Sequence, residues 1–321
     1  KEKIHGFWNE KDNKWYLFLP STQSISDTVI YYTGDVTEVS AGKLNKKRKY
    51  VSNAVASSKD CITFTTEFGK KDVIVMQSNL PSVQILLKND LTLEKVHEDK
   101  RIGFEGNTFI INDSDEKSNL VLSNCMEIKG RGNTTWKLYK KKSYQITFKK
   151  QVSVLGMQPA KKWILMANSS DDSMIRNQLV YQMAESFWGE YVPDFHYIDL
   201  WINGEYLGTY LLGEKVEIED SRLDLQEKGA LFEHDEGYYD ETENVVFSKM
   251  MQRHFSLKDT GTESKEVINE LMQSFEESVD RLMSYLYMTP SMDVTLEQLK
   301  SMIDVESFAK YYLINEYLLN K

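Results

Sequence analysis

The stretch that decides the fold is IKGRGNTTWKLYKKKSYQITFKK, Ile128 to Lys150. Within it Gly130, Arg131, Gly132 and Asn133 lie between two runs of strand-forming residues, which predicts a tight turn. Glycines in such a turn let backbone N–H groups approach an anion, and an arginine can grip a phosphate in two places. An ordinary β-turn explains the two glycines equally well, so both interpretations stay open.

Lysines are concentrated after this turn, in a chain whose net charge is −10. No Asp or Glu occurs between Asn133 and Ser170, whereas the following lysines do: Lys137, Lys140, Lys141, Lys142, Lys149, Lys150, Lys161 and Lys162. A lysine run is most often a solvated surface. Lys142, however, directly precedes the predicted strand SYQITF. A strand lysine beside a glycine loop is the arrangement with which phosphoryl-transfer sites hold nucleotide phosphates.

The segment ANSSDDSMIRN, Ala167 to Asn177, predicts the start of a helix. Apolar residues then recur every four positions, which places them on one helical face: Ile175, Leu179, Met183 and Phe187. Asp171 is expected to cap this helix rather than to act as a catalyst. Arg176 and Asn177 lie near its start, where free N–H groups favour anions.

The rest of the chain divides into a strand-rich first part and a mixed second part. Residues 1–98 contain repeated short strand patterns and predict a β-sandwich module, either Ig-like or chitobiase-like. Residues 99–120 are polar and predict a linker, and 121–321 form the second domain. That domain ends in two amphipathic helices, the second capped by Asp304. No helix stop signal precedes Lys321, so the chain is expected to be cut there.

Composition excludes several classes of protein. With 321 residues, 41% hydrophobic and 27% charged, the chain is neither disordered nor of low complexity. Its acidic balance disfavours a general nucleic-acid binder, and no run of 18 apolar residues predicts a membrane span. Cys61 and Cys125 are interpreted as small buried residues, with one disulfide as the alternative. The histidines are scattered without zinc-ligand spacing.

Five motifs in order carry a resemblance to a known family. They are RGNTTW at Arg131, KKSYQITF at Lys141, LGMQPAKKWILMAN at Leu155, DDSMIRN at Asp171 and INGEYLGTYLLGEKVEI at Ile202. Together they resemble the CotH kinase family (spore-coat protein H and relatives), which are atypical protein kinases. The resemblance covers residues 125 to 321 and leaves the N-terminal β module outside.

The resemblance implies an α+β chain, with a kinase-like second domain built from a small twisted sheet and a helical lobe. It implies that the turn Gly130–Asn133, with Arg131 and Lys142, contacts the phosphates of ATP, and that Arg176 also lies in the nucleotide site. Glu214 and Lys215 are expected where the hairpin FHYIDLWINGEYLGTYLL leads to the adenine. Supporting roles fall to Asp171 and to Glu185, a candidate partner for the lysine.

The implied activity is phosphorylation of Ser or Thr on secreted or coat proteins, with ATP and Mg²⁺ (or Mn²⁺). The implied location is secreted, at the cell surface or in the spore coat, and the chain opens KEKIHGFWNE with no apolar signal core. In the family, the catalytic aspartate and a metal-binding aspartate follow the helix that resembles SFAKYYLINEYLLNK. We therefore expect both beyond Lys321, and little or no phosphate transfer by the residues given.

Two other functions compete with the kinase. In the first, the chain is a cell-surface adhesin whose β-sandwich binds a glycan or a protein, and the kinase-like unit is a scaffold. In the second, the lysine-rich stretch binds nucleic acid with Trp136, Tyr139 and Tyr144 interleaved. The second is disfavoured, because aromatic residues at strand spacing are more simply explained as core.

Overall fold

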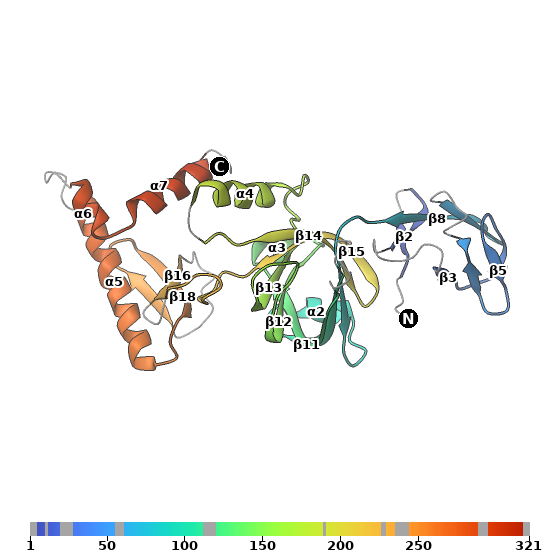
Figure 1. Ribbon diagram of the computed structural model, residues 1–321, viewed down its shortest axis with the longest axis horizontal. Coiled ribbons are helices and arrows are strands. Elements are labelled where there is room, and N and C mark those ends of the chain that lie inside the picture. Colours follow the sequence, from blue (N-terminus) through green and yellow to red (C-terminus); the bar gives the residue numbers. More distant parts are fainter. Residues whose placement is uncertain are drawn as a thin grey trace. The chain divides into compact units, whose positions relative to one another are not determined.

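The computed structural model describes residues 5–9, 12–19, 28–54, 61–111, 120–188, 191–225, 229–234, 244–287 and 295–316 (Figure 1). It contains both helices and strands, as the α+β prediction requires. The chain divides into two compact units. Unit 1 comprises Lys1–Ser170 and His196–Gly213, and unit 2 comprises Asp171–Phe195 and Glu214–Lys321.

Two small sheets form the N-terminal part of unit 1. The first has the order β1-β2-β8-β7-β4 and the second the order β3-β6-β5. Their bounds are β1 Phe7–Asn9, β2 Lys14–Leu19, β3 Val29–Tyr31, β4 Val36–Val39, β5 Lys43–Asn45, β6 Tyr50–Ser52, β7 Cys61–Thr66 and β8 Gly69–Gln77. Both sheets contribute to one buried apolar cluster, for example Leu17 from β2 and Val51 from β6. The strand prediction is therefore confirmed, and the name β-sandwich remains a prediction.

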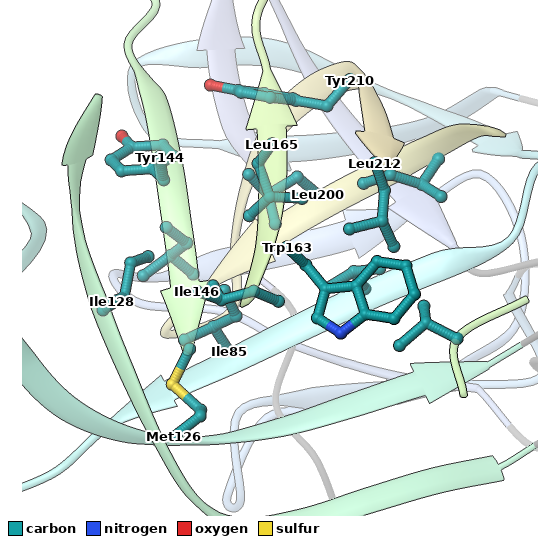
Figure 2. Packing of buried hydrophobic residues seen from close by; sticks show 14 of the residues in the cluster. Ile85, Met126, Ile128, Tyr144, Ile146, Trp163, Leu165, Leu200, Tyr210 and Leu212 are labelled. Carbon is teal, nitrogen blue, oxygen red and sulfur yellow. The ribbon is translucent and has the colours of Figure 1, made fainter. Parts of the chain in front are cut away.

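Seven strands of unit 1 form a closed barrel in the order β10-β11-β12-β13-β15-β14-β9. Their bounds are β9 Ser82–Leu87, β10 Phe104–Ile111, β11 Leu120–Arg131, β12 Ser143–Val152, β13 Ala160–Met166, β14 Phe195–Ile202 and β15 Glu205–Glu214. Alternation in β12 buries Tyr144, Ile146 and Phe148, which is the pattern of a strand with one apolar face. Figure 2 shows the interior filled by side chains around Trp163. The small twisted sheet of the sequence prediction is thus replaced by a filled barrel.

Strand pairing includes residues 82–87 and 104–111 in the barrel. The sequence grouped 82–87 with the N-terminal module and interpreted 99–120 as a linker. In the structure β9 pairs with β10 and, in parallel, with β14, while β10 pairs with β11. A seven-stranded barrel closes only if these two strands take part, so the barrel extends back to Ser82.

Unit 2 is built from a three-stranded sheet and helices. The sheet has the order β16-β18-β17, and the helix α4 contacts α7 (Figure 1). The bounds are α4 Arg176–Trp188, β16 Ala230–His234, β17 Val245–Ser248, β18 Arg253–Thr260, α5 Lys265–Tyr287, α6 Leu296–Lys300 and α7 Val305–Ile314. Phe275 of α5 stacks on Phe232 of β16, with ring centroids 3.9 Å apart. Asp304 accepts a hydrogen bond from the Ser307 N–H at 3.0 Å, which confirms the predicted cap.

Three smaller predictions are resolved by the structure. Cys61 is an exposed free thiol, so its interpretation as a buried residue is wrong, and the Cys125 side chain lies outside the described residues. On the predicted apolar face, Ile175, just before α4, and Leu179 are about half exposed, and Met183 is partly buried. Phe187 falls outside the side chains described. Among the described helices none is long and apolar enough to cross a membrane.

Candidate nucleotide site

The glycine turn lies at one end of the β11–β12 ladder. Gly130 pairs with Tyr144, and Arg131 pairs with Ser143, where the ladder ends. Lys142 is the residue immediately before Ser143. The turn then continues into α3, Thr134–Leu138, a five-residue helix that the sequence did not predict. Such a short helix has no apolar periodicity to detect. The register therefore places Lys142 near the turn formed by Gly130, Arg131, Gly132 and Asn133.

The two glycines serve the packing of the turn itself. A Cβ atom on Gly130 would lie 2.4 Å from the Trp136 ring and 2.6 Å from Cβ of Lys100. Gly132 has φ +96°, in the left-handed region that L side chains rarely adopt. Both positions therefore favour glycine, Gly130 because no side chain fits there and Gly132 because of its backbone conformation.

Lys142 is half-buried and turns back onto α3. Its ammonium donates a hydrogen bond to the Trp136 carbonyl and lies 5.4 Å from the centroid of the Trp136 ring. The side chain of Arg131 is exposed. One of the two predicted phosphate ligands therefore reaches solvent, and the other is held beside the turn by a neutral acceptor.

Three aromatic side chains, His97, Trp136 and Tyr144, pack together next to Lys142. The Tyr144 hydroxyl lies 2.7 Å from Nε2 of His97, and Trp136 packs edge-on against both rings. Burial lowers the pKa of His97, and the nearby positive charge of Lys142 lowers it further. Burial also raises the pKa of the Tyr144 phenol. Both groups are accordingly neutral near pH 7, so the positive charge of the site is that of its lysines and arginine.

The Lys141 side chain makes different contacts from Lys142, and the sequence analysis gave Lys141 no separate role. Its ammonium donates to the Thr209 carbonyl and lies 4.6 Å above the Tyr210 ring. Burial lowers its pKa to about 8, although the charge of buried Asp199 acts in the opposite direction. Strand alternation is the available signal, because adjacent residues entering a strand must point to opposite sides.

Asp171 and Arg176 lie in unit 2, at the start of α4. The Asp171 carboxylate accepts hydrogen bonds from the Ser173 hydroxyl at 2.6 Å and from the Arg176 N–H at 3.0 Å. These bonds lower the pKa of Asp171. The acid thus performs the predicted capping role, while Arg176 is exposed with Nε 3.6 Å from the Asp171 carboxylate.

Glu214 also lies in unit 2 and is buried at the end of β15. Its Oε2 accepts hydrogen bonds from the Tyr191 hydroxyl at 3.1 Å and from the Asp194 N–H at 3.2 Å. Lys215 lies 3.8 Å from buried Glu217. The Glu214 carboxylate therefore links β15 to residues 191–194, a structural role that the sequence did not indicate. Glu185, the other predicted supporting acid, is exposed on α4. Of the predicted site residues, the turn Gly130–Asn133 and Lys142 lie close together, and all of them belong to unit 1.

A comparison with family models identifies the second part of the chain. The model described as CotH kinase protein matches residues 128–321, which is more than half of the chain. The chain belongs to the CotH kinase family. The match begins within β11, so it includes the turn, Lys141 and Lys142 but not His97 or Lys100. A comparison with curated proteins found no match.

A CotH kinase would use ATP and a divalent metal, and the described residues fit these two groups unequally. Arg131 and Lys142 supply cations at the end of the barrel, which suits a phosphate. No group of three or more His, Cys, Asp or Glu side chains gathers within the described ranges. The fit is therefore to the nucleotide phosphates, and no metal ligand is assigned.

Proposed function

We propose that this chain forms the nucleotide-binding part of an ATP-dependent kinase that phosphorylates Ser or Thr on secreted or coat proteins. One observation carries the proposal: Arg131 at the end of β11 pairs with Ser143 of β12, the residue after Lys142, beside the glycine turn and inside the region that matches the CotH kinase family. ATP bound with Mg²⁺ or Mn²⁺ would supply the phosphoryl group. Catalysis of this kind depends mainly on positioning and on stabilising charge.

In this proposal the two cations share the work of holding phosphate. Arg131 is exposed and presents a planar fork that suits two phosphate oxygens. Lys142 exchanges the neutral Trp136 carbonyl for an anionic oxygen, which is favourable because charge-assisted hydrogen bonds are the stronger kind. Glu214 and Lys215 remain the proposed contacts near the adenine, and Arg176 remains a proposed third cation.

Calorimetric titration with Mg–ATP tests the proposal directly. We expect the wild-type chain to bind, and Lys142→Ala and Arg131→Ala each to weaken binding by roughly tenfold or more, the value of a lost charged hydrogen bond. Lys140→Ala is the matched control, because Lys140 is exposed on the same segment. Equal binding by all four proteins, or none by the wild type, would contradict the proposal.

The substrate and the location rest on the family alone. We propose export to the cell surface or spore coat, where Ser- or Thr-containing proteins are available as substrates. Fractionation of the source cells with an antibody against this chain tests the location. Recovery from the cytosol alone would contradict it.

A further inference from the structure

Lys100 reaches the glycine turn from outside the region of the family match. Its ammonium donates hydrogen bonds to the Gly132 carbonyl at 2.9 Å and to Oδ1 of Asn133. Its Cβ atom occupies the space beside Gly130, where a second Cβ would be only 2.6 Å away. One side chain therefore contacts three of the four residues of the turn.

The backbone that carries Lys100 is itself firmly anchored to the barrel. The helix α2, Leu93–Glu98, buries Val96 completely in the barrel core and contacts β11. His97 of the same helix is bound to Tyr144 and packs on Trp136. Lys100 follows two residues after α2 ends, so its position relative to the turn is fixed by buried contacts.

The turn needs such an anchor because of its glycines. Gly132 adopts φ +96°, and glycine populates positive and negative φ almost equally, so its own preference does not select this conformation. Asn133, with φ −107° and ψ −82°, makes no side-chain cap to α3. The Lys137 N–H donates to the Asn133 carbonyl at 3.2 Å, and the hydrogen bonds from Lys100 add a link to both Gly132 and Asn133.

We propose that Lys100 is a positioning residue for the nucleotide site. It holds Gly132 and Asn133 so that the Arg131 side chain stays exposed while the Lys142 ammonium stays beside α3. This inference rests on the proposed function and adds a residue that acts through the turn rather than on the phosphate. A turn already in its binding conformation loses less entropy when the nucleotide binds, and this raises affinity.

The test compares three variants of the full chain with the wild type. Lys100→Met keeps a long stem but removes the donors, Lys100→Arg restores donors, and Lys95→Met removes an exposed lysine of α2 that bonds Glu98 instead. Amide hydrogen exchange over residues 130–139 reports the order of the turn without nucleotide. Titration with Mg–ATP reports affinity.

We expect Lys100→Met to accelerate exchange in the turn and to weaken Mg–ATP binding by roughly tenfold. Lys100→Arg should recover both properties, and Lys95→Met should change neither. Equal affinity of the wild type and Lys100→Met, unchanged exchange, or an equal loss in Lys95→Met would overturn the inference. If the wild type binds no Mg–ATP, the proposed function fails, and the role of Lys100 fails with it. If the wild type binds but Lys100→Met binds equally well, only the role of Lys100 fails. Should Lys100→Met not fold, Lys100→Gln takes its place.

Discussion

The barrel of unit 1 and the helices of unit 2 bury their apolar side chains to very different extents. In the barrel Trp163 and Trp201 are fully buried. In α7 the apolar side chains Phe308, Tyr311 and Leu313 are each more than half exposed, and the described side chains of α5 include none that is fully buried. The barrel therefore buries its large apolar side chains within itself, whereas the described apolar side chains of α7 remain largely exposed.

The largest expected effect separates these two regions directly. Trp163→Ala should lower the free energy of unfolding by about 3–5 kcal/mol, because it removes a large side chain from a closed core. Phe308→Ala should change it by less than about 0.5 kcal/mol, because the ring is already 65% exposed. Urea denaturation of both variants measures the difference. Similar losses in the two variants would show that α7 is packed more tightly than described.

A smaller effect tests whether the tight packing of the barrel reaches its end. Gly130→Ala would force a methyl group into the Trp136 ring and the Lys100 stem, and we expect a loss of about 1–3 kcal/mol. Gly6→Ala is the control, since its Cβ would make only ordinary contacts at 3.5 Å and 3.7 Å. Thermal unfolding compares the two. A Gly130→Ala variant as stable as the control would mean that the turn moves freely.

The smallest effect is a pH dependence centred on Lys141. Its folded pKa of about 8 lies below the ordinary lysine value, so between about pH 8 and pH 10 the unfolded chain binds more protons than the folded one. Folding stability from this group therefore rises with pH through that window, and below pH 8 the cost of burying the charge is constant. The stability of the wild type relative to Lys141→Met should increase from pH 8 to pH 10 in urea titrations. A constant difference would contradict the lowered pKa.

The sequence was sufficient where the determining signal is local. Alternation predicted the strand at Tyr144 to Phe148, and the Asn203–Gly204 pair predicted the hairpin between β14 and β15, where both residues adopt positive φ. A capping aspartate predicted the start of α7 at Asp304. The five quoted motifs identified the family, and the family match confirms it.

The sequence was insufficient where the determining contact is distant in the chain. The hydrogen bonds from Lys100 to the turn join residues more than thirty positions apart, and no sequence pattern near Lys100 or in the turn predicts them. The same holds for β9. Its six residues could be assigned to the N-terminal strands from the sequence, and only their pairing with β14 assigns them to the barrel. The different directions of Lys141 and Lys142 follow from alternation, but the contacts of Lys141 with Thr209 and Tyr210 depend on the position of β15.

The position of β9 and β10 also bears on how the protein is divided for study. A fragment that begins at Ile128, where the family match begins, would lack β9, β10 and most of β11, and would leave part of β12 and the β9 side of β14 without hydrogen-bonding neighbours. Such open sheet edges recruit other chains and promote aggregation. Recombinant work on the kinase region alone should therefore start before Ser82.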